Sequence, residues 1–243
     1  MLKAALQMIF PEQCPLCSEL VESQGGLCGS CWTETPFIHG TVCNACGAPE
    51  IGPSAGDEVI CDSCRAHPRP WRAGRSVLRY SGGGRRLVLA LKHSDRLDLV
   101  PTLAHWMAER AKLYATPGSV VVPVPCHWRR LLQRRYNQAA ALARPIAAEL
   151  GMTYCPDALW RPRATQTQDH MTTDERFTNL SAAIAPTPHG RIRLAGRSVL
   201  LIDDVMTSGA TLTASALAAK DAGADDISVI TLARAVPAAY LAA

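Results

Sequence analysis

Two adjacent carboxylates follow a run of branched apolar residues near the C-terminal end of the chain. The run Val199–Ile202 is typical of a buried parallel strand, and Asp203 and Asp204 come directly after it. Open α/β sheets bind ligands at the carboxyl ends of their strands. The acid pair is therefore a candidate for holding a polar ligand.

A turn rich in hydroxyl groups and glycine follows the two acids. It contains Thr207, Ser208, Gly209 and Thr211, and a helical pattern begins at its end. Because N–H groups at the start of a helix bind anions, this turn can hold a phosphate while the acids bind sugar hydroxyls. The alternative, an ordinary strand-to-helix turn with a capping aspartate, does not explain two acids and three hydroxyls together.

This stretch resembles the phosphoribosyl-pyrophosphate (PRPP) signature of type I phosphoribosyltransferases, in which two acids precede a Thr/Ser-Gly-x-Thr loop. The resemblance implies that Asp203 and Asp204 are the catalytic acids and contact the ribose hydroxyls. It also implies that the turn surrounds the 5′-phosphate. The residues expected around that phosphate are Val205, Thr207, Ser208, Gly209, Ala210 and Thr211.

Eight of the ten cysteines form four Cys-x-x-Cys pairs within the first 64 residues. Each pair can place two thiolates on one tetrahedral zinc ion. Ten residues separate the first pair from the second, and fourteen separate the third from the fourth, which are zinc-ribbon spacings. We therefore expect two closed structural zinc sites, formed by Cys14, Cys17, Cys28 and Cys31 and by Cys43, Cys46, Cys61 and Cys64.

Other chemistries fit these cysteine pairs less well. A disulfide framework needs an oxidising compartment, a redox Cys-x-x-Cys is normally single, and an iron–sulfur cluster has no typical spacing here. Two further alternatives stay open at this point. The two zinc sites can be cross-braced, sharing alternate pairs, or one site can be lost.

The charge is distributed unevenly along the chain. Residues 1–70 carry 3 Lys+Arg against 8 Asp+Glu (net −5), and residues 71–243 carry 22 against 13 (net +9). The acidic part lacks the basic footprint of a nucleic-acid-binding ribbon, which favours a structural or protein-docking role. A polyanion is expected on the basic part.

One basic run in the second part contains four arginines and no acid. The planar guanidinium groups of arginine match the geometry of phosphates, and aromatic rings can stack on bases. The run is therefore a candidate for binding single-stranded DNA. Its candidate contact residues are Arg129, Arg130, Arg134, Arg135 and Tyr136. The alternative is a solvated helix surface.

Strand patterns alternate with helical patterns after residue 70. The strand patterns cover 77–80, 119–125, 199–203 and 227–233, and the helical patterns cover 85–93, 97–115, 137–150 and 211–222. Gly82–Gly84 is expected to end the first strand. This order predicts an α/β fold with a parallel sheet and helices on both faces. We place a double zinc ribbon over 1–70 and a phosphoribosyltransferase-like domain over 71–243, joined by a linker that includes Arg69.

Over nearly its whole length the chain resembles the ComF family, cytoplasmic proteins linked to DNA uptake in natural competence. The elements that carry this resemblance, besides the cysteine pairs and the PRPP signature, are Phe10-Pro11, Leu91-Lys92, Arg134-Arg135-Tyr136-Asn137-Gln138, Thr165 with Gln168, and Arg176 with Asn179. Two positions depart from the family pattern. Arg135 replaces the glycine expected before the aromatic residue, and Ser208 stands where many members have threonine.

The resemblance implies that the chain binds PRPP with Mg²⁺, and it makes Lys92 and Arg135 candidates for the pyrophosphate. One hypothesis is an enzyme that transfers phosphoribose and releases pyrophosphate. The other is a non-catalytic module that binds PRPP or single-stranded DNA and docks competence or recombination proteins. Because no apolar run reaches the ~18 residues of a membrane span, we expect a cytoplasmic protein without membrane insertion.

Overall fold

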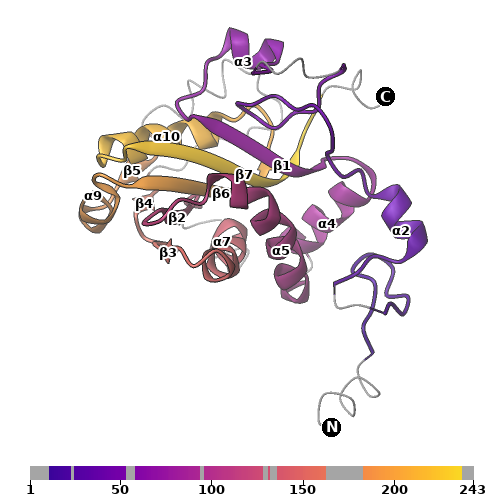
Figure 1. Cartoon of the computed structure of the whole chain (residues 1–243). Helices are drawn as coiled ribbons and strands as arrows, with labels where there is room; N and C mark the ends of the chain where they lie inside the picture. Colours follow the sequence, from indigo (N-terminus) through magenta and orange to yellow (C-terminus); the bar gives the residue numbers. More distant parts are fainter. Residues whose placement is uncertain are drawn as a thin grey trace.

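A computed structural model describes residues 11–22, 25–52, 58–93, 96–127, 131, 136–162 and 183–236. Its centre is a five-stranded sheet in which every neighbouring pair of strands is parallel (Figure 1). The spatial order is β1 (Ala73–Arg79), β7 (Asp226–Arg234), β6 (Ser198–Met206), β2 (Val120–Pro123) and β3 (Thr153–Tyr154). A separate antiparallel pair consists of β4 (Leu159–Trp160) and β5 (Ala185–Pro186). The predicted parallel sheet is confirmed.

Helices cover both faces of the sheet, as expected (Figure 1). One face packs against α4 (Gly82–His93), α5 (Val100–Ala111) and α7 (Gln138–Glu149). The other face packs against α10 (Ala210–Asp221) and α9 (Pro188–Leu194). Two 3₁₀ turns, Leu97–Leu99 and Lys112–Tyr114, flank α5, and two short helices, α2 (Gly29–Glu34) and α3 (Asp62–Ala66), lie among the cysteines.

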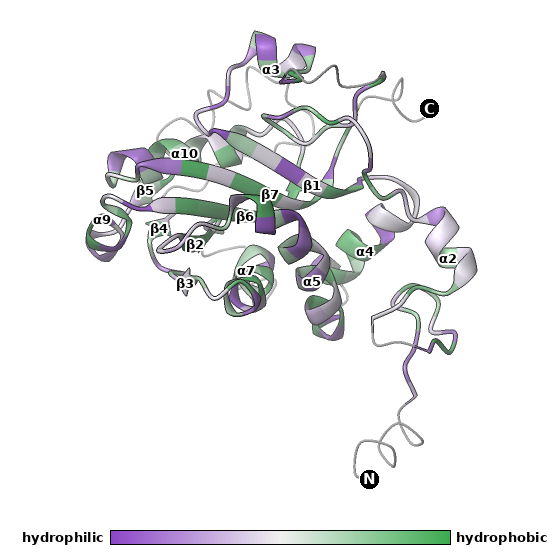
Figure 2. Cartoon of the chain, viewed as in Figure 1, coloured by the Kyte–Doolittle hydropathy of each residue, from purple (hydrophilic) through white to green (hydrophobic). Residues whose placement is uncertain are grey.

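The branched apolar run of β6 explains why this strand lies inside the sheet. Leu200 and Ile202 enter the core beneath α5 and α7, while Val199 and Leu201 enter the core beneath α10. Successive side chains of a strand point to opposite faces, so a strand buried on both sides needs an unbroken apolar run. Figure 2 shows β6 and β7 hydrophobic over their central parts, in keeping with burial on both faces.

The chain departs from the sequence predictions at two junctions. Gly82–Gly84 begins α4 rather than only ending a strand, and a Cβ on Gly83 would lie 2.3 Å from Oγ1 of Thr35, too close for any side chain there. The strand β6 continues through both acids to Met206, since its pairing with β7 extends to Arg234. The loop between β6 and α10 is consequently only three residues long.

The second set of cysteines is packed onto the sheet. Cys43, Cys46, Cys61 and Cys64 are buried in the same hydrophobic cluster as α10 and the α10 face of β6. The turn between the first two of them lies against β1, where the Gly74 N–H donates to the Asn44 carbonyl at 2.9 Å. Trp71 Nε1 donates to the Ala45 carbonyl at 2.5 Å.

The first set of cysteines forms a smaller cluster of its own, next to α4. Cys14, Cys28 and Cys31 are its buried members. An exposed ion pair joins this part to α4, with Arg86 Nη2 2.5 Å from Glu34 Oε2. Exposed pairs of this kind contribute little to stability.

The close approach of the second cysteine turn to β1 depends on Gly47. This residue has φ +67°, and a Cβ there would lie 2.7 Å from the Ser76 nitrogen; Gly40 has φ +73° with open space around it. We expect Gly40→Ala to cost about 1–2 kcal/mol of unfolding free energy from the left-handed backbone alone. Gly47→Ala should cost about 1–3 kcal/mol more, from overpacking against the strand. Chemical denaturation of both variants measures the difference, and equal losses would contradict the packing described here.

Candidate metal centres and anion-binding site

The carboxyl end of β6 brings the two predicted acids together with the predicted lysine. The Asp204 N–H donates to Oδ1 of Asp203 at 2.9 Å. Lys92, at the end of α4, places its Nζ 3.1 Å from Oδ2 of Asp204. Both charged side chains of this pair are largely buried, with 20% and 13% of their surfaces exposed. The structure thus assembles Asp203, Asp204 and Lys92 from two segments more than 100 residues apart in sequence.

Asp203 is an unusually weak acid for an aspartate. Burial raises its pKa to about 7, and the neighbouring Asp204 carboxylate contributes in the same direction. The Asp204 N–H, Lys92 and Arg161 act against this rise by favouring the ionised form. A carboxyl group whose pKa lies near neutral pH, beside a ligand pocket, is common at functional sites.

Sequence reasoning assigned no specific role at the acid pair to Arg161. It follows β4 directly and only 8% of its surface is exposed. Its charge acts on Asp203, although Arg161 follows a strand of the separate two-stranded sheet. No local pattern signals this, because an arginine after a short apolar pair is ordinary in sequence.

The loop after β6 forms a pocket with the start of α10. Gly209, with φ +83°, lies at the N-cap of α10 and has no side chain with which to cap the helix. Ser208 Oγ accepts a hydrogen bond from the Ala210 N–H at 3.4 Å. The pocket lining consists of Asp203, Val205, Met206, Thr207, Ser208, Gly209, Ala210, Thr211 and Leu212.

This pocket contains all six residues expected around the phosphate. Its wall is the backbone at the N-terminus of a 12-residue helix, where unpaired N–H groups and the helix dipole favour an anion. Asp204 is absent from the lining and instead contacts Lys92 beside it. The arrangement can therefore hold a phosphate group next to an acid pair.

The segment before α7 lies beside Lys92. The Tyr136 hydroxyl donates to the Leu91 carbonyl, and Asn137 Nδ2 donates to the Val124 carbonyl at 3.0 Å. Asn137 also caps α7 by accepting from the Ala139 N–H. Tyr136 thus holds the end of α4 that carries Lys92.

Several predicted residues lie outside the described residues. They are Arg129, Arg130, Arg134 and Arg135 of the basic run, and Thr165, Gln168, Arg176 and Asn179.

Each set of four cysteines gathers its sulfur atoms at one point. Within each set, all the sulfurs lie within 4.8 Å of one another, and the sets follow chain order. The sulfurs of a zinc tetrathiolate with 2.3 Å bonds are about 3.8 Å apart. Cys17 and Cys28 Sγ are 3.5 Å apart in the first set, and Cys46 and Cys61 Sγ are 3.7 Å apart in the second. Both sets therefore fit zinc, and the sequential grouping, not the cross-braced one, is confirmed.

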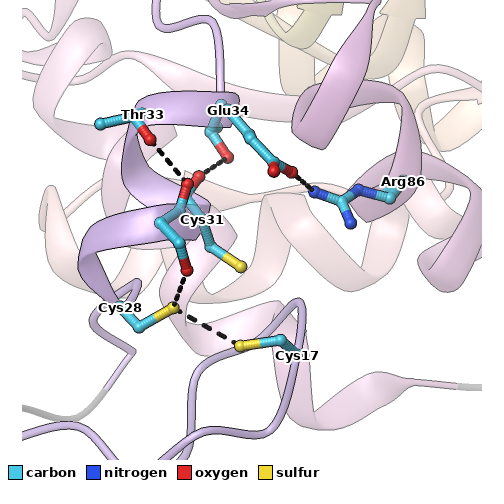
Figure 3. Close-up of polar contacts among 8 residues, drawn as sticks. Cys17, Cys28, Cys31, Thr33, Glu34 and Arg86 are labelled. Carbon is cyan, nitrogen blue, oxygen red and sulfur yellow. Dashed lines mark hydrogen bonds and ion pairs between the residues drawn. The ribbon is translucent and has the colours of Figure 1, made fainter.

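The two sets differ in their surroundings. Figure 3 shows Cys17, Cys28 and Cys31 of the first set facing one another at the start of α2, with Cys17 exposed. In the second set all four cysteines are buried. Hydrogen bonds from the Cys43, Cys61 and Cys64 thiols lower the pKa of Cys46, while hydrogen bonds with Cys43 and Cys46 raise the pKa of Cys61 and Cys64.

All ten cysteines are free, so no disulfide framework is present among them. Across the described part of the chain, no helix is long and apolar enough to cross a membrane.

Two family models and several known proteins match this chain. A family model for the double zinc ribbon domain matches residues 5–65, and one for the phosphoribosyl transferase domain matches residues 137–241. DNA utilization protein YhgH of Salmonella typhimurium is 30% identical over 234 residues, covering 93% of this chain and 99% of that protein.

Two further relatives are named as competence proteins. Competence protein F of Haemophilus influenzae is 26% identical and covers 88% of this chain and 92% of that protein. Competence protein ComFC of Bacillus subtilis is 24% identical and covers 88% of this chain and 87% of that protein.

The two cysteine sets predict two zinc ions per chain. Metal analysis after purification under reducing conditions should find about two ions, and Cys17→Ser and Cys64→Ser should each remove about one. A wild-type chain without zinc would contradict the assignment. Loss of both ions in either variant would contradict two independent sites.

The raised pKa of Asp203 predicts a pH-dependent stability. Between the ordinary aspartate pKa of about 4 and the folded value of about 7, the folded chain binds more protons than the unfolded chain, so stability falls as pH rises. Asp203→Asn removes the titrating carboxyl group and with it this loss of stability. Its melting temperature should exceed the wild-type value by an amount that grows from pH 5 to pH 7 and then levels off. Asp225→Asn, at an exposed position, is the control, and a pH-independent difference would contradict the raised pKa.

Proposed function

The chain belongs to the family of DNA utilization protein YhgH and competence proteins F and ComFC, and on that premise we propose that it binds PRPP together with Mg²⁺. The observation that carries the proposal is the continuous site at the end of β6. There an acid pair, a short glycine-containing loop and the start of α10 form one pocket.

Each part of that site suits one part of PRPP. The loop from Thr207 to Thr211 would hold the 5′-phosphate through backbone N–H and hydroxyl groups. Asp203 and Asp204 would bind the ribose hydroxyls. Lys92, held beside the acids, would receive the pyrophosphate as a compact positive charge, with Arg135 as a second candidate.

The acid pair also suits Mg²⁺. This ion is usually held by one or two carboxylates together with substrate phosphates, and the adjacent carboxylates of Asp203 and Asp204 offer such oxygen ligands. When bound, Mg²⁺ would offset the charge of the pyrophosphate. The ion would also favour the ionised form of Asp203, whose pKa is near 7 in its absence.

Transfer of the phosphoribosyl group is the enzymatic form of this proposal. In it, an acceptor forms a bond to the anomeric carbon, the bond to pyrophosphate breaks, and pyrophosphate leaves with the bonding electrons. Positioning and charge stabilisation would supply the catalysis. The proposed function is PRPP binding, and an assay of pyrophosphate release tests whether turnover also occurs.

Single-stranded DNA is the second candidate ligand. The net charge of +9 over residues 71–243 and the arginine-rich run between 129 and 135 favour it, and the relatives' names concern DNA utilization and competence. In this form the cysteine-rich part would dock competence or recombination proteins. The ten free cysteines favour a reducing compartment, so we place the protein in the cytoplasm.

Calorimetric titration with PRPP and Mg²⁺ tests the proposal. Asp203→Asn/Asp204→Asn should weaken binding at least about tenfold, because each charged contact contributes about 1.5–3 kcal/mol. The matched control is Asp225→Asn/Asp226→Asn, a second acid pair that precedes and begins β7 at the opposite end of the parallel sheet. It should bind PRPP like the wild type.

Two further arms separate the alternatives. Pyrophosphate release with a panel of nucleobases, lost in the Asp203/Asp204 variant, would identify an enzyme. Salt-sensitive binding of single-stranded DNA, weakened by Arg134→Ala/Arg135→Ala, would support the DNA-binding form. Failure of the wild type to bind PRPP would contradict the proposed function.

A further inference from the structure

We propose that Arg69 and Arg234 couple the second zinc site to the phosphate-binding loop, so that zinc in this site holds the loop in its anion-binding form. The part of this inference that concerns PRPP rests on the proposed function, whereas the part that concerns loop order does not. The second zinc site is then a structural component of the ligand site as well as a stabiliser of the cysteine-rich part.

Both arginines contact a zinc-site sulfur with one nitrogen and the loop with another. Arg69 Nε donates to Cys64 Sγ at 3.4 Å, while its Nη1 donates to the Ser208 carbonyl at 2.9 Å. Arg234 Nη2 lies 3.8 Å from Cys46 Sγ. Its Nη1 donates to the carbonyls of Met206 and Thr207 at 3.0 and 2.5 Å.

A guanidinium group suits this double role. Its donors form a rigid planar fork, so fixing one nitrogen also fixes the direction of the others. Arg234 is only 5% exposed, and its place at the end of β7 is set by sheet pairing with Met206. Arg69 packs against Gly209, where a Cβ would lie 3.0 Å from Nη1.

The carbonyls that the arginines hold belong to three successive peptide groups. In a trans peptide the C=O of one residue and the N–H of the next point in opposite directions, and no peptide in the described chain is cis. Holding the carbonyls of Met206, Thr207 and Ser208 toward the zinc site therefore turns the following N–H groups away from it. Those N–H groups belong to Thr207, Ser208 and Gly209, which line the phosphate pocket.

Charge balance gives zinc a role in this arrangement. A zinc ion with four thiolates carries two negative charges, and the second set is buried in the core. Two guanidinium groups, each next to one of its sulfurs, offset those charges. The first set has no comparable arginine contact among the described residues, so it serves as an internal control.

Hydrogen exchange measured by mass spectrometry tests the coupling without PRPP. Arg69→Gln should retain two zinc ions yet speed amide exchange in the 206–212 peptide at least tenfold. Arg72→Gln, an exposed neighbour paired with Asp226, is the matched control and should exchange like the wild type. Cys64→Ser should speed the same exchange, whereas Cys17→Ser should not.

Zinc release gives a second, reciprocal readout. Coupling between two sites acts equally in both directions on their binding free energies, so PRPP should raise the chelator concentration needed at equilibrium to remove one of the two zinc ions. Arg69→Gln should remove that protection.

The two readouts separate the coupling from the proposed function. Unchanged exchange at 206–212 in both Arg69→Gln and Cys64→Ser would overturn the coupling, whatever PRPP does. If Cys64→Ser does not fold, Arg69→Gln alone decides the result. Faster exchange in the two variants, together with a wild-type chain that does not bind PRPP, would support the coupling and overturn the proposed function.

Discussion

The backbone pairing that holds β6 between β7 and β2 determines where the acid pair and the loop that follows it lie. β6 is hydrogen-bonded on both edges and covered by helices on both faces, so its apolar run is buried, and its two acids lie toward its carboxyl end. The pairing with β7 reaches Met206 and Arg234, which shortens the following loop and places Arg234 behind it. The start of α10 is then held within reach of the acid pair.

Charges around this end of the sheet are matched locally, although the chain as a whole is unevenly charged. Lys92 and Arg161 favour the ionised form of Asp203, and Lys92 pairs with Asp204, while Arg69 and Arg234 lie against the sulfurs of the second cysteine set. Three of these four cations belong to the basic part of the chain. The basic excess of residues 71–243 is therefore used partly inside the molecule, where it balances carboxylates and thiolates that the fold buries.

Features coded by contiguous residues could be predicted from the sequence. The strand, acid pair and loop of 199–211 and the four Cys-x-x-Cys motifs follow from local spacing, and Leu91-Lys92 followed from a family resemblance. The contacts of Arg69, Arg161 and Arg234 could not be predicted in this way. Arg69 stands between two prolines and was assigned to a linker, yet it bonds to Ser208, 139 residues away. Such contacts depend on how the cysteine-rich part packs on the sheet, which no local pattern encodes.

We propose that the end of β6 and the start of α10 form a PRPP site backed by the second zinc site. A crystal structure of the zinc-loaded chain grown with Mg²⁺ and PRPP tests it most directly. We expect the 5′-phosphate to lie against the backbone N–H groups of Thr207–Thr211 and the ribose to lie beside Asp203 and Asp204. Arg69 and Arg234 should still join the loop to the zinc-bound sulfurs. Ligand density at any other place, or a loop that no longer contacts either arginine, would contradict this proposal.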